Sequence, residues 1–391
     1  MKRTKILVVY ENGAGGHRSL ALAIDEALKE LADIDSSVLE IDSLAPSARK
    51  KMYSAFMDFR HYVRPLARFG FKTFALSPNP VFALYRHLGS ILQPLGVRRL
   101  LDFLHREQPD LIVSTHFRPN VALNAWRERG RLRTPVYAAI ADYVAHGVYA
   151  QPAIGQYYVA TDAVRDDLLR HGVPRERIHT TGIPVSLTLL QSDSRSQSQL
   201  RHDLGLIPEA KTILLMGGAR GDVDYATLLQ ALAVRKANVQ VVVICGWNKA
   251  LRARIQELAN TLPFPVHIKG FERNMAIWYR AVDLVMTKPG GMTTTEVLVM
   301  EKPMILLAPA PGKEEVQAER LTAAGVALYE RDPHLAIEAA LRVMSDEAQK
   351  QRMTAATQAL RRPDAAREVA ALLAQAARNS AASLSSHTSR P

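Results

Sequence analysis

The segment Met286–Glu296 has the residue types of a phosphate-binding turn followed by a helix. An apolar run at 281–285 is expected to form a short buried strand before it. Glycines followed by threonines at a helix start leave backbone N–H groups and the positive dipole end available to an anion. A carboxylate one turn later could reach the hydroxyls of a ribose, although an ordinary capped turn is the alternative. The residues concerned are Gly290, Gly291, Thr293, Thr294 and Glu296.

A second glycine-rich turn lies between a strand expected at 5–10 and an amphipathic helix expected at 19–31. It contains Gly15, Gly16 and His17. Arg18 stands where the third glycine of a GxGxxG dinucleotide fingerprint belongs. Asp42 lies where a ribose-binding acid would be found, but one acid does not restore the motif. NAD binding is therefore the weaker interpretation of this turn.

Further polar residues follow other expected strands, where open parallel sheets place their ligands. They are Asp142 and His146 after the strand at 136–140, and Gly217, Gly218 and Arg220 after the strand at 211–216. An arginine here could offset the charge of a diphosphate through two parallel hydrogen bonds. A single histidine or aspartate on a loop is more often structural, so the functional interpretation depends on several of them meeting.

The elements that must position these residues alternate between strands and helices, which predicts parallel sheets covered by helices. The 391-residue length favours two domains. We place the first at 1–185 and the second at 186–378, with a disordered tail at 379–391. In the second half, one long helix is expected over 347–379.

Composition limits the function classes. One cysteine, Cys245, excludes an intramolecular disulfide and a cysteine-based metal site. No Asp-x-Asp motif is placed to hold a metal between a strand and a diphosphate, and no His, Asp or Glu cluster has the spacing of metal ligands. No apolar run is long enough to span a bilayer, so a cytoplasmic or peripheral protein is expected. The net charge of +12 predicts anionic partners.

Much of the positive charge lies at 49–100, where ten lysines and arginines are interleaved with aromatic residues and the one acid is Asp58. Such a segment is typical of a surface that binds an anionic lipid interface. A helical insertion with a solvated basic face is the alternative. Nucleic acid is a weaker option because no nucleic-acid-binding signature accompanies the charge.

Together these motifs resemble the GT-B glycosyltransferases related to monogalactosyldiacylglycerol synthase, the processive diacylglycerol glucosyltransferases and, more distantly, the transferase that makes lipid II. The motifs that carry the resemblance span nearly the whole chain. They are Gly13–His17, Ala141–His146, Thr181–Val185, Lys288–Glu296 and Pro311–Glu315. Three residues depart from the family pattern: Ala14, Ala141 and Tyr149, the last standing where tryptophan is common.

The resemblance implies an α/β fold of GT-B type, with two Rossmann-like domains facing across a cleft. It implies that Glu296 binds the ribose of UDP and that the Gly-Thr turn holds the diphosphate. The backbone at Phe271 would read uracil, and Glu314 with Gln317 would select the hexose. Asp142 would be the base that takes the acceptor proton, with His17 as its alternative or partner. His146 would position acceptor or phosphate.

The implied activity is inverting, metal-independent transfer of a hexose from a UDP-sugar to a lipid, most simply diacylglycerol, at the cytoplasmic membrane face. No cofactor and no nucleic acid are expected. Two other activities on the same fold remain open, a UDP-sugar epimerase and a lipid-linked N-acetylglucosaminyl transferase. A non-catalytic protein that binds membranes or nucleic acid through residues 49–100 is the alternative from another class.

Overall fold

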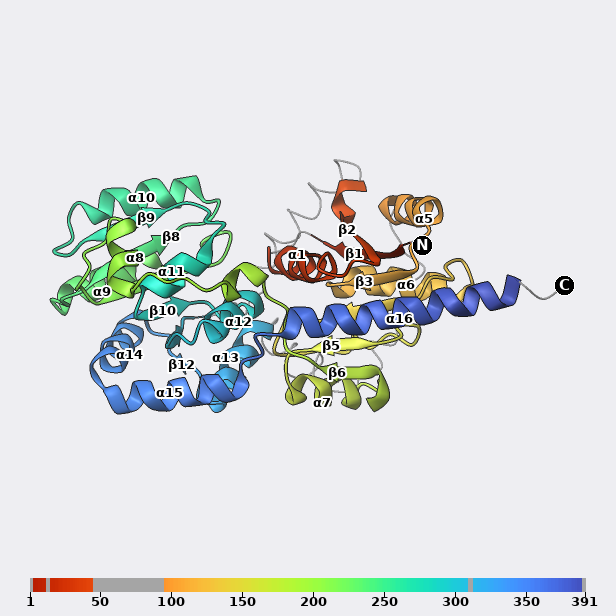
Figure 1. Cartoon of the computed structure of the whole chain (residues 1–391). Coiled ribbons are helices and arrows are strands. Elements are labelled where there is room, and N and C mark those ends of the chain that lie inside the picture. The colour runs from red at the N-terminus through yellow and green to blue at the C-terminus, as the bar shows by residue number, and fades with distance from the viewer. Residues whose placement is uncertain (1–2, 12–14, 45–94, 309–311, 389–391) are drawn as a thin grey trace. The chain divides into compact units, whose positions relative to one another are not determined.

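The computed structural model describes residues 3–11, 15–44, 95–308 and 312–388 (Figure 1). The chain divides into two compact units, each built around its own sheet. Unit 1 comprises residues 1–187 and 362–391, and unit 2 comprises residues 188–361. Most of the basic aromatic segment at 49–100 lies outside the described residues, so the membrane-binding prediction for it stays a prediction.

Unit 1 contains a six-stranded parallel sheet in the order β2-β1-β3-β4-β5-β6. Its strands are β1 (Thr4–Tyr10), β2 (Ile34–Glu40), β3 (Leu111–Ser114), β4 (Val136–Ala139), β5 (Tyr157–Val159) and β6 (Ile178–Thr180). Its helices are α1 (Gly16–Leu28), α5 (Leu95–Glu107), α6 (Phe117–Glu128), α7 (Asp162–Arg170) and α16 (Ala365–Thr388), with short 3-10 turns at Ile41–Leu44 and Arg175–Arg177.

Helix α16 completes unit 1 from the far end of the sequence. It packs against α1, β1 and β3, and Figure 1 shows it as the long blue helix beside this sheet. Its apolar stripe is buried and consists of Ala366, Val369, Ala370, Leu373, Ala374 and Ala377. Two ion pairs flank the stripe, Arg367 with Glu30 and Arg378 with Asp33, each through two hydrogen bonds. Apolar burial therefore places this helix with the first unit.

Unit 2 contains a second six-stranded parallel sheet in the order β12-β11-β10-β7-β8-β9. Its strands are β7 (Thr212–Met216), β8 (Gln240–Ile244), β9 (Val266–Lys269), β10 (Leu284–Thr287), β11 (Met304–Leu306) and β12 (Leu328–Tyr329). Its helices are α8 (Gln197–Asp203), α9 (Tyr225–Val234), α10 (Lys249–Ala259), α11 (Met275–Ala281), α12 (Gly291–Val299), α13 (Lys313–Ala323), α14 (Pro333–Ser345) and α15 (Glu347–Leu360). A 3-10 turn at Leu187–Leu190 bridges the unit boundary.

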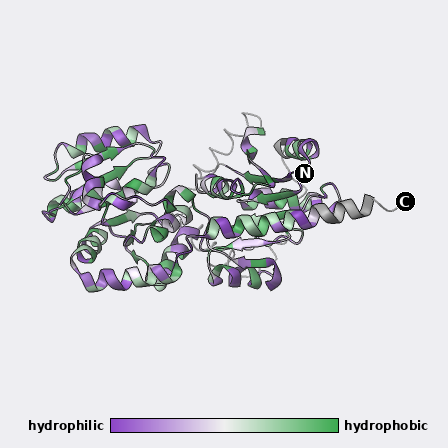
Figure 2. Cartoon of the chain, in the orientation of Figure 1, coloured by the Kyte–Doolittle hydropathy of each residue, from purple (hydrophilic) through white to green (hydrophobic). Residues whose placement is uncertain are grey.

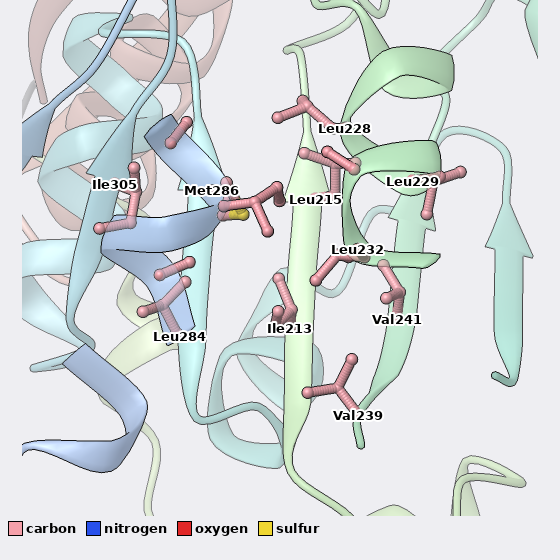
Figure 3. Close-up of a cluster of buried hydrophobic side chains, with 14 of the residues drawn as sticks. Ile213, Leu215, Leu228, Leu229, Leu232, Val239, Val241, Leu284, Met286 and Ile305 are labelled. Atoms are coloured by element: carbon pink, nitrogen blue, oxygen red, sulfur yellow. The ribbon is translucent and has the colours of Figure 1, made fainter. Parts of the chain in front are cut away.

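The core of unit 2 is formed where α9 and α14 cover the central strands. Figure 3 shows Leu228, Leu229 and Leu232 of α9 packed toward Ile213 and Leu215 of β7. Because the strands of a parallel sheet are covered on both faces, they are almost continuously apolar, and Figure 2 shows hydrophobic colour concentrated along them. The strands are therefore rigid supports for the loops at their carboxyl ends.

The long helix expected over 347–379 is wrong, because the structure has two helices there. Helix α15 ends at Leu360 and α16 begins at Ala365. Pro363 lies in the gap, lacks a backbone N–H and disfavours the helical conformation of Arg362 before it. Helix α16 extends to Thr388, past the start of the tail expected at 379–391.

Among the residues that the structure describes, no helix is both long and apolar enough to cross a membrane. Cys245 is fully buried after β8, and burial raises the pKa of its thiol. It is a core residue.

Candidate functional site

The strand order of unit 2 brings its two glycine turns together. Strands β7 and β10 are neighbours, although they are the first and fourth strands of the unit. This is a topological switch point, where open α/β sheets leave a crevice at the carboxyl ends of the strands. Gly217 and Gly218 follow β7, and Lys288–Gly291 follow β10. The topology therefore joins the predicted phosphate turn to the second glycine turn.

The start of α12 has the properties of an anion site. Gly290 is the N-cap, and no side chain caps the helix. The hydroxyls of Thr294 and Thr295 instead donate to the carbonyls of Gly290 (3.0 Å) and Gly291 (2.7 Å). Within the described residues, no side-chain oxygen caps the first backbone N–H groups of the helix, and such groups can bind a ligand. Thr293 lies in the same turn and is partly exposed.

A Cβ built at Gly290 would meet no atom of the described residues within 4 Å, and the backbone φ is −83°, so their packing does not require glycine there. Glycine is needed at such a position only if something approaches the backbone closely. The opposite holds at Gly246, where φ is +60° and a Cβ would lie 2.2 Å from the carbonyl oxygen of Ala219. Gly246 is required because the loop after β7 packs directly against its backbone. Gly290, in contrast, leaves its backbone accessible to a group that could bind there.

Glu296 lies one turn behind this helix start. The Tyr279 hydroxyl of α11 donates to its Oε2 atom at 2.8 Å. The residue keeps part of its surface exposed, yet burial of the carboxyl raises its pKa to about 7, and the bond from Tyr279 acts in the opposite direction. A partly enclosed carboxylate of this kind is suited to accept hydrogen bonds from paired hydroxyls, as a ribose offers.

Lys288 links the two glycine turns through charge. Its ammonium lies 3.0 Å from Glu314 Oε1 and 3.5 Å from Asp222 Oδ2. Arg220, whose Nε lies 3.6 Å from the same Asp222 oxygen, adds a second cation. Glu314 belongs to the first turn of α13 rather than to a loop. The predicted residues Arg220 and Glu314 thus share one charged network with Lys288, which sequence reasoning gave no role of its own.

Two other predicted residues of unit 2 have different surroundings. Gln317 is buried, and its Nε2 donates to the carbonyl of Pro289 at 2.5 Å, so it supports the turn that precedes Gly290. Phe271 is exposed and stacks on the exposed ring of Trp247, with centroids 4.0 Å apart. Trp247 was not anticipated. The pair lies at the carboxyl ends of β8 and β9.

In unit 1 the switch point lies between β1 and β3. Gly15, with φ +81°, precedes α1, and Gly16 is the first residue of that helix. His17 follows and is buried, with Nδ1 2.7 Å from the carbonyl oxygen of Thr115. A carbonyl can only accept, so Nδ1 carries the proton and the neutral ring has its lone pair on Nε2. The contact fixes the tautomer that a general base needs.

Three residues near His17 were missed. His116 contacts the His17 ring edge-on at 4.3 Å between centroids and lies 3.3 Å from the Glu11 carboxylate. Arg118 forms an ion pair with the same carboxylate. Burial raises the pKa of Glu11, but His116 and Arg118 outweigh it and hold the pKa below its usual value. The rule that selected Asp142, namely polar residues after a parallel strand, also selects His116 after β3.

Asp142 and His146 lie in the buried loop after β4. The Tyr149 hydroxyl donates to Asp142, and burial together with this carboxylate raises the pKa of Tyr149 well above its usual value. The His146 ring packs on Tyr149 at 4.8 Å and on Phe117 at 5.0 Å. Phe117 also contacts His116 at 4.4 Å. Through Phe117, the loop carrying Asp142 adjoins the His17–His116 pair.

A buried carboxylate holds this loop in place. Asp167 of α7 accepts from the backbone N–H of Ala145 at 2.9 Å and pairs with Arg170. Such charge-assisted bonds to backbone fix a loop more firmly than neutral ones. In the part of the chain that is described, no three His, Cys, Asp or Glu side chains form a metal-binding group.

Two family models match the chain. Residues 17–185 match "Monogalactosyldiacylglycerol (MGDG) synthase", and residues 212–369 match "Glycosyltransferase family 28 C-terminal domain". The chain is 30% identical over 358 residues to the processive diacylglycerol beta-glucosyltransferase of Staphylococcus carnosus, covering 88% of this chain and 85% of the relative. It is 26% identical over 375 residues to the enzyme of that name from Bacillus cytotoxicus, covering 94% and 93%.

Solved structures with low identity share the fold. MurG of Acinetobacter baumannii superposes with a TM-score of 0.59 at 16% identity, covering 95% of this chain and 99% of its own. UDP-GlcNAc 2-epimerase of Neisseria meningitidis, bound to UDP-GlcNAc, gives 0.62 at 15% identity, covering 95% and 100%. These likenesses and the two parallel sheets confirm the predicted GT-B class.

Proposed function

Because the chain belongs to the glycosyltransferase family of monogalactosyldiacylglycerol synthase and processive diacylglycerol beta-glucosyltransferase, we propose that it transfers a hexose from a UDP-sugar to diacylglycerol. Membership confirms the resemblance derived from the motifs and makes the chain a glycosyltransferase. The acceptor, inversion at the sugar and action at the cytoplasmic membrane face are parts of the proposal.

One observation carries the donor half of the proposal: an uncapped α12 starts at Gly290 on the switch-point strand, with Glu296 behind it. The diphosphate would lie at the helix start, where backbone N–H groups and the dipole stabilise negative charge. The Lys288 ammonium and Arg220 would offset further charge on the departing UDP. The ribose hydroxyls would donate to Glu296. These groups stabilise the leaving group without requiring a metal.

The acceptor half rests on His17. In the proposed step the acceptor hydroxyl oxygen attacks C1 of the hexose while the C1–O bond to the diphosphate breaks, and UDP leaves with the bonding electrons. The hydroxyl proton passes to Nε2 of His17, since Nδ1 already donates to Thr115. The Tyr149 hydroxyl already donates to Asp142, whereas the Nδ1 contact holds His17 in the tautomer that a base needs, so we take His17 as the base and Asp142 as the alternative. Attack opposite the leaving group inverts C1.

The test is transfer of labelled hexose from UDP-glucose and UDP-galactose into the organic phase, with diacylglycerol in anionic vesicles and EDTA present. We expect label in the lipid from at least one donor. Glu296→Ala should lose transfer and UDP affinity, whereas Glu301→Ala, which removes a carboxylate paired with Arg361 just past the end of α12, should retain both. Epimerised UDP-sugar without labelled lipid would contradict the proposal and favour an epimerase.

A further inference from the structure

Tyr279 is a buried side chain whose hydroxyl reaches the candidate ribose-binding carboxylate. It is 0% exposed, and its oxygen lies 2.8 Å from Glu296 Oε2 and 3.8 Å from Met216 Sδ. Among residues 3–11, 15–44, 95–308 and 312–388, Tyr279 is the hydrogen-bond partner found for the Glu296 carboxyl. The tyrosine therefore decides which of the two carboxyl oxygens is already occupied.

The backbone that carries Tyr279 is fixed at the end of α11. The Lys302 ammonium donates to the carbonyls of Arg280 (3.3 Å) and Val282 (3.0 Å). The Arg201 guanidinium, also buried, donates to the carbonyl of Ala281 at 2.7 Å. Gln197 Nε2 also donates to the carbonyls of Arg280 and Val282, so all three carbonyls at this helix end are paired. The three residues that follow Tyr279 are thus held by side chains from outside the helix. This leaves the phenol ring little freedom to move.

We infer that Tyr279 is a positioning residue for the sugar-nucleotide donor: its hydroxyl holds Oε2 of Glu296, so that Oε1 accepts the ribose hydroxyls in one orientation. The inference rests on the proposed function, because it takes Glu296 as the ribose ligand. Helix α11 thus orients the Glu296 carboxylate, a role that the Gly-Thr turn does not supply by itself. An enclosed carboxylate without this donor would be costly to ionise.

The consequence is a pH dependence of donor binding. Burial raises the pKa of Glu296 to about 7, and the Tyr279 bond is the interaction that lowers it. The ribose diol binds the ionised carboxylate, so affinity rises with pH through this range. Removing the hydroxyl raises the pKa further, because hydrogen bonds to a charged group favour ionisation. The midpoint of the binding curve must then move to higher pH.

The experiment is isothermal titration of the full chain with UDP-glucose between pH 5.5 and 9, since the diphosphate of a UDP-sugar stays fully ionised there. We expect Tyr279→Phe to move the midpoint upward by roughly one pH unit, as the loss of one charge-assisted bond implies. At the highest pH its affinity should return to that of the wild type. Tyr158→Phe removes a buried hydroxyl bonded to Gln156 in unit 1 and should leave the midpoint unchanged.

Two results would overturn the inference. If Tyr279→Phe weakens binding equally at every pH, the hydroxyl does not act by favouring the ionised form of the Glu296 carboxyl. If its curve coincides with the wild-type curve, it has no role in donor binding. Glu296→Gln separates these outcomes from a failure of the proposed function. Weakened binding in Glu296→Gln keeps the ribose contact whatever Tyr279→Phe does, whereas unchanged binding removes both the contact and the inference.

Discussion

His17 and Thr115 are joined by two reciprocal contacts: Nδ1 of His17 meets the Thr115 carbonyl at 2.7 Å, and the Thr115 hydroxyl donates to the His17 carbonyl at 3.0 Å. The contacts tie the first turn of α1 to the end of β3, the two sides of the switch point in unit 1. They fix both the position and the tautomer of the imidazole. A side chain needed only for packing would require neither.

This pair leads to a prediction for catalysis. His17→Gln keeps a hydrogen-bonding side chain of similar length but cannot accept the acceptor proton. We expect kcat to fall by about 10²–10⁴, with UDP-glucose affinity unchanged because His17 lies outside unit 2. Asp142→Asn should reduce kcat less. Steady-state transfer rates and titration of the donor check both, and a larger loss in Asp142→Asn would transfer the role of base to Asp142.

The raised pKa of Glu296 predicts that this carboxyl lowers the stability of the fold at the pH at which it is ionised. Its folded-state pKa of about 7 lies above the usual 4.5, so the unfolded chain loses this proton first as the pH rises. Stability therefore falls between about pH 4.5 and 7, and the penalty is complete above pH 7. Glu296→Gln should be more stable than wild type at pH 8 by on the order of 2–3 kcal/mol, and equal to it near pH 4.5. Urea unfolding at both pH values measures this, and a gain independent of pH would contradict it.

Gly290 and Gly246 predict opposite outcomes for the same substitution. Gly290→Ala has room for its methyl group and an ordinary φ, so the melting temperature should stay near wild type while donor affinity falls at least tenfold from obstruction of the phosphate turn. Gly246→Ala places a methyl against Ala219 at positive φ and should fail to fold or lose several kcal/mol. Thermal melts beside UDP titrations compare them. Normal UDP binding by Gly290→Ala would place the diphosphate elsewhere.

Asp167 predicts that the Asp142 loop depends on α7. Asp167→Ala removes the acceptor for the Ala145 N–H and the partner of Arg170. Leaving a buried N–H unpaired costs about 1–3 kcal/mol, so we expect that loss in urea unfolding together with reduced kcat. Asp166→Ala, its exposed neighbour on the same helix, is the matched control. Equal stability of the two variants would show that the loop is held by other contacts.

Much of the fold could be predicted because local pattern and tertiary structure agree. Apolar strands followed by glycine turns fixed the α/β class, and the Lys288–Glu296 turn lies where its residue types indicated. Pro363 also indicated a helix break, but the alanine-rich sequence on both sides of it led to the prediction of one long helix. The side-chain partners were not predictable. Tyr279 matters through its hydrogen bond to Glu296 on a neighbouring helix, which no local spacing reveals.

For Gln317, the residue type suggested a ligand contact, but it could not show which group the side chain contacts in the fold. A glutamine after a glycine turn has the chemistry to contact a sugar, and the resemblance implied that role. In the structure its side chain is buried and donates to the carbonyl of Pro289. A polar side chain can serve the backbone of a turn as well as a ligand, and sequence does not tell which partner is nearer.

The return of α16 to unit 1 has a consequence for biosynthesis. Unit 2 is one continuous stretch of chain, residues 188–361, and can fold as soon as it leaves the ribosome. Unit 1 is interrupted, and the apolar surface that α1 and β1 present to α16 stays open until residues 365–388 have been made. Unit 1, whose first residues are translated before unit 2, can therefore finish folding only after unit 2 has been made. During that interval the nascent chain exposes this apolar surface, and exposed apolar surface of that kind is what makes incomplete folds prone to aggregate.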